Sequence, residues 1–423
     1  MNVKELLMGK SECACGKSHI CPIKQVVIKP GAIDEIPEML GKYKNVLLVA
    51  DENTYKAAGF KVESKIKDKI KSRIVFSGDK ILVPNESAIA EIKALVTEEC
   101  DLVLGVGSGV INDLCKHVSF VSGLPYFIVA TAPSMDGYAS VGAALILDGM
   151  KVTLNAAVPE AIIADTNVLK DAPMNMILAG YGDIIGKYSC LSDWKLSSLV
   201  NGEYLCDFVL NATYLEVEKT RKLAKRLNER DPEAITTLME ALVAVGILMA
   251  YVGNSRPASG SEHHFSHYFE IVGILFGEEY LPHGIDVFYS AAETAKIREK
   301  LISIEDPELI RSSYDRDVYV ANIERIYGKL SCEVLALQDR LGWYNDVEKR
   351  VAVYKEKWSE IRALLKTAPG YKDMIDMIEE VGMSYNDFVT LYGEKKIKDA
   401  YLYAKDLKDR YTVLWMYSDL FFN

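Results

Sequence analysis

The stretch "DLVLGVGSGVINDLCKHVS", residues 101–119, passes from a short apolar run through three glycines into an amphipathic segment. Its first seven residues are rich in Val and Leu, as is typical of a buried strand in a parallel sheet. Gly105, Gly107 and Gly109 allow backbone N–H groups to approach an anion, and a helix starting near Val110 points its positive end at the same place. The stretch therefore predicts a strand, a phosphate-binding turn and a helix, with a dinucleotide pyrophosphate as the natural ligand.

This turn departs from the two common phosphate-binding patterns. It is not a standard G-x-G-x-x-G, because Val110, Ile111 and Asn112 follow Gly109, and no GK[ST] follows as in a Walker loop. A glycine-rich turn that carries no ligand therefore stays open as the alternative.

The same pattern covers the first 167 residues, in which short apolar runs alternate with helical segments. This alternation predicts an α/β domain with a parallel sheet and helices on both faces. Residues 143–155, "AALILDGMKVTLN", add a predicted hairpin with Asp148-Gly149 as its turn. The predicted strands are Lys24–Lys29, Asn45–Asp51, Ser72–Gly78, Asp101–Gly107 and Pro125–Thr131.

Strand signals stop after residues 161–173, "AIIADTNVLKDAP", and the chain reads as helices to its end. We therefore predict a boundary near Asp165–Lys170, with residues 1–167 as a dinucleotide-binding α/β domain and residues 168–423 as an all-helical domain. The final stretch, "YTVLWMYSDLFFN" (residues 411–423), is too aromatic for a loose tail. We expect it to pack on the helical domain or on a second copy of the chain.

Composition narrows the class of protein and its partners. The formal net charge of −11 disfavours nucleic acid or an anionic membrane as the main partner. The start of the chain lacks the long apolar core of a signal peptide, and the apolar run Leu242–Val252 is shorter than the roughly 20 residues that a membrane span needs. With eight cysteines expected to be reduced, these features predict a cytoplasmic protein.

Three cysteines and a histidine gather in residues 13–21, "CACGKSHIC". Cys13, Cys15, Cys21 and His19 are soft ligands at short spacing, which makes a small zinc site conceivable. The spacing C-x-C-x5-C matches no common zinc knuckle, so the alternative is a loop that leads into the first strand.

Polar side chains follow two of the predicted strands. Asp51 ends the second strand, where a carboxylate can accept hydrogen bonds from an adenosine ribose and so favour NAD over NADP. Its alternative role is a helix N-cap. Thr131, Ser134, Asp136 and Ser140 follow the fifth strand, at the sheet edge where ligands of open α/β folds bind, although such residues are also ordinary in turns.

The helical half supplies candidate metal ligands. Asp183 lies in an otherwise apolar helix, where a carboxylate must be paired or metal-bound, and Lys187 one turn on is the alternative partner. In "SEHHFSH" (residues 261–267), helical spacing puts either His263 or His264 on the face of His267 and leaves that choice open. Either of these histidines, with Asp183 and His283, would form a site of two imidazoles and one carboxylate, which is typical of a catalytic metal.

Several motifs, taken in order along the chain, resemble the sn-glycerol-1-phosphate dehydrogenases. They are the glycine turn, "TAPSMDGYAS" (residues 131–140), "GYGDIIGKYS" (180–189), "SRPASGSEHHFSH" (255–267) and "LPHG" (281–284). This family belongs with the glycerol dehydrogenases, iron-containing alcohol dehydrogenases and dehydroquinate synthases. The resemblance covers residues 24–301, and leaves the cysteine segment and the chain after about Asp306 without an assigned role.

The resemblance implies a dehydroquinate synthase-like fold and an enzyme that interconverts sn-glycerol 1-phosphate and dihydroxyacetone phosphate with NAD, or NADP, and one divalent metal ion. Zinc and nickel are the expected metals, with iron as an alternative. Matched residue by residue, the metal ligands are Asp183, His263 and His283, and the substrate contacts are Asp136, Asp183 and His267. The cofactor contacts are Gly107, Ser108, Gly109, Val110, Ile111, Asn112, Asp113, Thr131, Ala132, Pro133, Ser134 and Ser140, to which the argument above adds Asp51.

The implied chemistry assigns further roles. His267 hydrogen-bonds the substrate or relays the hydroxyl proton, Asp136 orients a hydroxyl, and the substrate phosphate needs cationic or N–H partners. Arg256, Lys187 and the backbone of "PASGS" (residues 257–261) are the candidates for that phosphate. A glycerol or other polyol dehydrogenase of the same superfamily, and a catalytically silent NAD-binding protein, are the alternative functions. The apolar C-terminus favours a homo-oligomer.

Overall fold

The computed structural model describes residues 2–147, 150–307 and 315–421. The chain forms two compact units, one of Met1–Ile184 with Glu218–Ser255 and the other of Ile185–Val217 with Arg256–Asn423. Two of the three divisions fall inside a helix, α8 (Met174–Asn201) and α9 (Asp207–Arg221), which therefore run through both units. The predicted boundary near Asp165–Lys170 marks the point where the sequence changes from strands and helices to helices alone, whereas the two units are defined by their compactness. The boundary stays a prediction.

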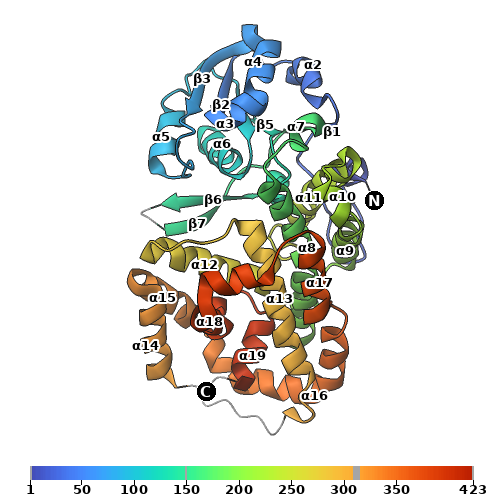
Figure 1. Ribbon diagram of the computed structural model, residues 1–423, viewed down its shortest axis with the longest axis vertical. Helices are drawn as coiled ribbons and strands as arrows, with labels where there is room; N and C mark the ends of the chain where they lie inside the picture. Colours follow the sequence, from blue (N-terminus) through green and yellow to red (C-terminus); the bar gives the residue numbers. More distant parts are fainter. Residues whose placement is uncertain (1, 148–149, 308–314, 422–423) are drawn as a thin grey trace. The chain divides into compact units, whose positions relative to one another are not determined.

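A six-stranded sheet, part of which is labelled in Figure 1, forms the centre of the first unit. Its strand order is β1-β8-β5-β4-β2-β3. Every neighbouring pair is parallel, which confirms the predicted fold class. The last strand in sequence lies between β1 and β5, so the chain crosses over the sheet to reach it. The strands are β1 Gln25–Lys29, β2 Val46–Asp51, β3 Ile70–Phe76, β4 Leu102–Gly107, β5 Tyr126–Ala130 and β8 Ala161–Asp165.

Alternation of side chains along the strands gives the sheet two apolar faces. One face of β4, with Leu104 and Val106, joins a buried cluster with η1 (Ala32–Glu35), α2 (Ile36–Leu40) and α4 (Phe60–Ile66). The opposite face packs against α6 (Gly109–Ser122), which in turn contacts α5 (Glu86–Lys93). Helices on both faces are what a doubly wound sheet requires.

The predicted hairpin is also present. Strands β6 (Gly142–Leu147) and β7 (Met150–Asn155) pair antiparallel, while the Asp148-Gly149 turn lies outside the described residues. The unit is completed by α1 (Val3–Leu7), α3 (Glu52–Thr54), α7 (Thr166–Leu169), α10 (Ala224–Asn228) and α11 (Pro232–Val252).

Helix α11 is longer than the apolar run in the sequence suggests, because Pro232 to Leu242 extends it to 21 residues. Its length and hydropathy would suffice to cross a bilayer, yet 72% of its apolar window is buried inside the protein. It contacts α1, α7 and the 3-10 turn η4 (Asp136–Ala139). A core helix shows the same features, so the match is weak evidence for a membrane span.

The second unit is helical throughout its described residues. Helices α12 and α13 pack along one another, and α13 also contacts α16, α17, α18 and α19. The C-terminal α19 is buried from Val413 to Leu420, which confirms that the end of the chain packs on helices of its own unit. The helices are α12 Ser261–Phe276, α13 His283–Ile302, α14 Arg316–Tyr327, α15 Ser331–Leu341, α16 Val347–Leu365, α17 Tyr371–Glu380, α18 Tyr385–Tyr403 and α19 Val413–Phe421.

Candidate active site

Three imidazoles gather where α12 and α13 begin. The ring centroids of His263 and His283 lie 5.2 Å apart, and the ring of His267 lies 6.0 Å from the first and 5.5 Å from the second. His264 is fully buried, and in the described part of the chain neither of its ring nitrogens has a hydrogen-bond partner. Burial, with Arg410 nearby, lowers the pKa of His264 well below its usual value. Of the two histidines that helical spacing left open, His263 is therefore the one whose ring joins the cluster.

Hydrogen bonds at Nδ1 orient two of these rings. The Nδ1 atom of His263 lies 2.6 Å from Oε1 of Glu262, which also accepts the Gly260 N–H at 2.8 Å. The Nδ1 atom of His283 lies 3.3 Å from Oγ of Ser266. A ring held at Nδ1 presents Nε2 as its ligand atom, and a carboxylate on the far nitrogen is the usual support of a metal-binding histidine.

Asp183 supplies an oxygen to the same place. Its Oδ2 accepts the backbone N–H of Asp136 at 3.0 Å, which ties the loop after β5 to α8. One ligand atom from each of Asp183, His263 and His283 lies within 4.8 Å of the other two. Two imidazoles and one carboxylate leave coordination positions open for substrate, so the residues fit a catalytic zinc, nickel or iron ion.

Two buried carboxyl groups, those of Glu262 and Asp193, lie at the start of the helix that carries the candidate metal ligand His263. Burial raises the pKa of Glu262 to about 7, against the opposing effects of the Gly260 N–H, Lys187 and Arg410. Burial, and then the charge of Glu262, raise the pKa of Asp193 to about 6. A divalent cation beside His263 favours the ionised form of Glu262, because positive charge stabilises a nearby carboxylate.

The glycine turn joins β4 to α6 as predicted. A Cβ on Gly105 would lie 2.9 Å from Cys115 Sγ, and one on Gly107 would lie 2.5 Å from Ile111 Cβ. These two glycines therefore allow α6 to pack closely on the sheet, whereas a Cβ on Gly109 would meet only Met135, at 3.4 Å. The N-cap residue Ser108 makes no side-chain hydrogen bond to the helix end.

The other predicted cofactor residues of α6 serve the fold with their side chains. Ile111 and Asn112 are buried, and the Asn112 amide accepts from Tyr126 Oη at 2.8 Å and donates to Asp113 at 3.0 Å. Asp113 accepts the Ala144 N–H at 3.2 Å. Any contact of Ile111 and Asn112 with a cofactor would thus use mainly the backbone, whereas Val110 is partly exposed.

The loop after β5 lies beside the turn. The Thr131 N–H donates to the Gly107 carbonyl at 3.1 Å, and the Ala132 carbonyl accepts from Tyr138 Oη at 2.7 Å. The Pro133 carbonyl oxygen would lie only 1.9 Å from a Cβ on Gly180, so α8 approaches this loop closely. Ser134 hydrogen-bonds Tyr138.

Two further predicted cofactor residues have structural partners. Ser140 Oγ accepts from Lys116 Nζ at 3.3 Å. Asp51 caps α3, its Oδ1 accepting the Thr54 N–H at 2.9 Å, so the alternative N-cap role is present. Its contact with a ribose stays a prediction.

Arg256 and part of the "PASGS" backbone, two of the three candidates for phosphate binding, have partners inside the protein. The Arg256 guanidinium donates to Glu203 at 2.8 Å and to the Tyr411 carbonyl at 2.7 Å. In the "PASGS" backbone, the Gly260 N–H donates to Glu262 and the Ser261 N–H donates to Asp193 Oδ2 at 2.7 Å. These hydrogen bonds hold the start of α12 in place, and the phosphate-binding role of Arg256 and of this backbone stays a prediction.

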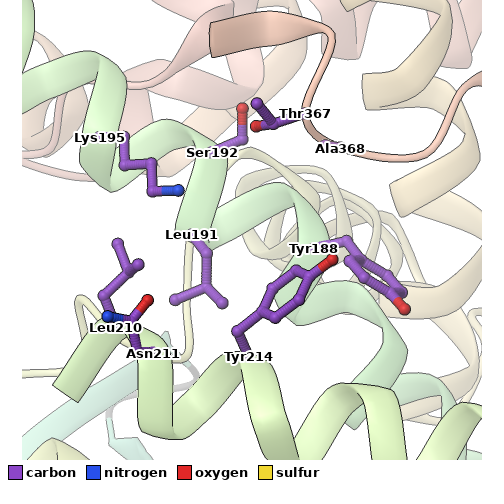
Figure 2. Close-up of a pocket in the computed structure, with 9 residues that line it drawn as sticks. All are labelled: Tyr188, Leu191, Ser192, Lys195, Leu210, Asn211, Tyr214, Thr367 and Ala368. Carbon is purple, nitrogen blue, oxygen red and sulfur yellow. The ribbon is translucent and has the colours of Figure 1, made fainter. Parts of the chain in front are cut away.

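A cavity of about 230 Å³ lies elsewhere in the second unit, between α8, α9 and residues 367–368. Figure 2 shows its lining, which includes Tyr188, Lys195 and Tyr214. None of the predicted site residues lines it, so this cavity is separate from the histidine cluster.

Sequence reasoning missed three supporting residues. Glu262 contacts His263, Ser266 contacts His283, and Asp193 accepts the Ser261 N–H. An acidic residue directly before a candidate histidine was a signal for Glu262, because carboxylate–histidine pairs accompany many metal sites. No local signal marked Asp193, which is 68 residues from its partner.

The chain is similar in sequence to proteins of known name. Residues 27–173 match the family model of the iron-containing alcohol dehydrogenases. The chain is 35% identical to a glycerol-1-phosphate dehydrogenase [NAD(P)+] of Halalkalibacterium halodurans, over 68% of this chain and 74% of that one. It is 28% identical to the protein of the same name from Bacillus subtilis, over 93% and 90% of the two chains.

Solved structures agree on the fold. A probable glycerol dehydrogenase from Sinorhizobium meliloti superposes with a TM-score of 0.59 at 16% identity, covering 90% of this chain and 88% of that one. An iron-containing alcohol dehydrogenase from Corynebacterium glutamicum superposes with a TM-score of 0.57 at 18% identity, covering 95% and 96%. The doubly wound sheet, the helical second unit and the level of identity to the bacterial relatives lead to one conclusion: the chain belongs to the glycerol-1-phosphate dehydrogenase family, within the iron-containing alcohol dehydrogenase superfamily.

Proposed function

We propose that this protein interconverts sn-glycerol 1-phosphate and dihydroxyacetone phosphate, using NAD or NADP and one divalent metal ion. The observation that carries the proposal is the set of Asp183, His263 and His283, whose ligand atoms lie within 4.8 Å of one another. The names of the bacterial and archaeal relatives, glycerol-1-phosphate dehydrogenase [NAD(P)+], supply the substrate and the cofactor class.

The metal would supply Lewis acidity at the C2 oxygen of the substrate, and the nicotinamide would exchange a hydride with C2. The protein's part is to hold the ligands and to manage the hydroxyl proton. Glu262 and Ser266 orient His263 and His283, so that each Nε2 is available as a ligand. His267, stacked on His283 and partly exposed, is placed to hydrogen-bond the substrate hydroxyl or relay its proton.

Asp136 is proposed to orient a substrate hydroxyl. Its backbone N–H donates to Asp183, so the loop that carries it is linked to a metal ligand. A shift in this loop would therefore disturb both a substrate contact and a metal ligand. Lys187, buried on α8, remains as the proposed cation for the substrate phosphate.

The cofactor is proposed to bind at the turn from Gly107 to Asp113 and at the loop from Thr131 to Ser134. The two segments are joined by the Thr131 to Gly107 hydrogen bond, and the N-terminal end of the 14-residue α6 lies at the turn. A helix N-terminus favours an anion such as a pyrophosphate. Asp51, at the end of β2, would repel a 2′-phosphate and so favour NAD over NADP.

The deciding experiment combines metal analysis with NADH oxidation by dihydroxyacetone phosphate. We expect a metal at the Asp183 site and turnover that chelation abolishes. His263→Ala should lose this metal and turnover while still binding NAD, whereas His264→Ala should keep the metal. A protein that turns over glycerol but not glycerol 1-phosphate, or a His263→Ala variant with normal activity, would contradict the proposal.

We also propose a cytoplasmic location and a homo-oligomer. All eight cysteines lie in the described residues and none forms a disulfide, which agrees with a reducing compartment. The apolar C-terminus no longer argues for an oligomer, because α19 is buried within its own unit. The oligomeric state is measured directly by sedimentation of the full chain.

A further inference from the structure

The N-terminal cysteine segment has no role in the proposed reaction, yet it is built like a metal site. We infer that Cys13, Cys15, His19 and Cys206 form a second, structural site for a thiophilic divalent cation, of which zinc is the best fit. This inference goes beyond the proposed function and does not depend on it.

The distances suit a closed tetrahedral site. One ligand atom from each of the four residues lies within 4.8 Å of the other three, and Cys15 Sγ lies 3.4 Å from His19 Nε2. Around a zinc ion with its usual bond lengths, two sulfurs lie about 3.8 Å apart and a sulfur and a nitrogen about 3.5 Å apart. A small contraction of the thiols would therefore complete the coordination without a change of backbone.

His19 is oriented as a ligand. Its Nδ1 lies 3.1 Å from the Tyr251 carbonyl oxygen, and its ring stacks on the Tyr251 ring with centroids 5.2 Å apart. A carbonyl can only accept, so Nδ1 carries the proton and Nε2 presents its lone pair toward Cys15. The side chain is 1% exposed, and its Nε2 lies 3.4 Å from Cys15 Sγ inside the cluster.

The backbone of the segment forms a closed loop that holds three of the ligands together. Lys10 and His19 exchange two backbone hydrogen bonds, each of 2.8 Å, and the Gly16 N–H donates to the Cys13 carbonyl at 2.9 Å. Gly9 adopts a φ of +71°, and a Cβ there would lie 2.7 Å from the His19 carbonyl oxygen. The loop thus returns on itself so that Cys13, Cys15 and His19 face one point.

Cys206 completes the set in place of Cys21. It is fully buried and immediately precedes α9, nearly two hundred residues further along the chain. Cys21 is not among the residues whose ligand atoms lie within 4.8 Å of one another. Three thiolates and one imidazole fill all four positions, so this site has no place for substrate, unlike the site of Asp183, His263 and His283.

Apolar packing next to the segment is mixed: Met8 and Ile20 are 80% and 73% exposed, whereas Leu6 and Ile23 are buried. A metal bound to Cys206 would fasten the loop to the start of α9. Thiolate and imidazole ligands select zinc over magnesium or calcium, which prefer oxygen.

The test is the zinc content of the full-length protein purified with zinc in the growth medium, measured by mass spectrometry of the metal. We expect two metal ions per chain in the wild type, one in Cys206→Ser and in Cys13→Ser/Cys15→Ser, and one in His263→Ala. Cys21→Ser and the exposed Cys332→Ser are the matched controls, and both should retain two. One ion per chain in the wild type, lost in His263→Ala and kept in Cys206→Ser, would overturn the inference.

A second measurement covers cysteine variants that do not fold. The wild type and His263→Ala are loaded with cobalt, and thiolate-to-cobalt charge-transfer absorption is recorded. We expect the band in both proteins, because thiolates are absent from the Asp183 site. Its absence from both would contradict the inference even if the enzyme were active, so failure here is distinct from failure of the proposed reaction.

Discussion

Glu262 and Ser266 contact the Nδ1 atoms of the two candidate metal ligands His263 and His283, at 2.6 and 3.3 Å. Neither residue is a candidate ligand. The Glu262 carboxylate favours the His263 tautomer in which Nε2 is free to ligate, whereas the Ser266 hydroxyl, which can donate or accept, holds the His283 ring in place. Glu262 is itself buried and accepts the Gly260 N–H, so its carboxylate is fixed by the first turn of the helix that carries the histidines. At the scale of single residues, the site depends as much on these partners as on the ligands.

We predict that Glu262→Gln weakens metal binding by about 10- to 100-fold, because an amide is a poorer acceptor for the His263 Nδ1–H than a carboxylate. The fold should persist, since Gln has the same size. Competition with a fluorescent chelator measures the affinity. Glu279→Gln, at an exposed position, is the control and should match the wild type. An unchanged affinity in Glu262→Gln would remove Glu262 from the site.

The β4–α6 connection shows how an element can serve packing and ligand binding at once. Gly107 lies where α6 meets the sheet, while Gly109 opens the helix and has room for a methyl group beside Met135. Lys116, further along α6, donates to the carbonyls of Gly137 and Gly142 at 2.8 and 2.9 Å. The helix therefore holds the segment with Ser140 as well as the turn.

The two glycines should respond differently to alanine. In Gly107→Ala the new Cβ would lie 2.5 Å from Ile111 Cβ, and we expect overpacking to cost about 1–3 kcal/mol in the free energy of unfolding. Gly109→Ala should keep the stability and raise the KM for NAD, because its methyl group would face an anion at the turn. Urea unfolding and NAD saturation curves separate the two effects. Equal losses of stability would refute the assigned roles.

Lys116 gives the stability of this element a pH dependence. Burial lowers its pKa to about 8 from 10.5, so between these values the unfolded chain binds more protons than the folded one. Stability attributable to Lys116 therefore rises with pH across that window, by about 3 kcal/mol in total. Lys116→Met, which keeps the length of the side chain, should lack this rise.

The measurement for Lys116 is the unfolding free energy of both proteins at several pH values that start at about 8 and cover the lower part of the predicted window. The difference between wild type and variant cancels the titration of other groups. A difference that stays constant with pH would show that Lys116 is not titrating in the folded state as proposed.

At the scale of the whole molecule, the two units differ in their tryptophan content. All four tryptophans, Trp194, Trp343, Trp358 and Trp415, lie in the second unit, so their fluorescence reports on that unit alone. Its last helix is tied to α16 by a buried bidentate pair, in which Arg350 donates twice to Asp419 at 2.7 Å. Tyr354 also donates to Asp419, at 2.6 Å.

We predict that Asp419→Ala destabilises the second unit by about 3–5 kcal/mol, because it leaves the Arg350 charge buried without its partner. Tryptophan fluorescence during urea unfolding measures the change. Asp339→Ala is the matched control, since it breaks an exposed bidentate pair with Arg316 and should cost about 1 kcal/mol or less. Similar losses in the two variants would contradict the role of burial.

The sequence by itself determined the class of fold and the position of the turn. Alternating apolar runs, glycines and helical segments are local patterns, and the strands they predicted match β1, β2, β4 and β5 to within one residue at each end. Predicted strand Ser72–Gly78 is shifted, since β3 runs from Ile70 to Phe76. Motif order added the family, and with it the reaction.

The tertiary structure decided what depends on proximity between distant positions. Helical spacing could not choose between His263 and His264, because both share a face with His267; only the approach of α13, which carries His283, separates them. Likewise, the sequence could not show that the Arg256 guanidinium lies beside Glu203, to which it donates at 2.8 Å. A side chain's role follows from the groups that surround it in space, and the linear pattern does not contain them.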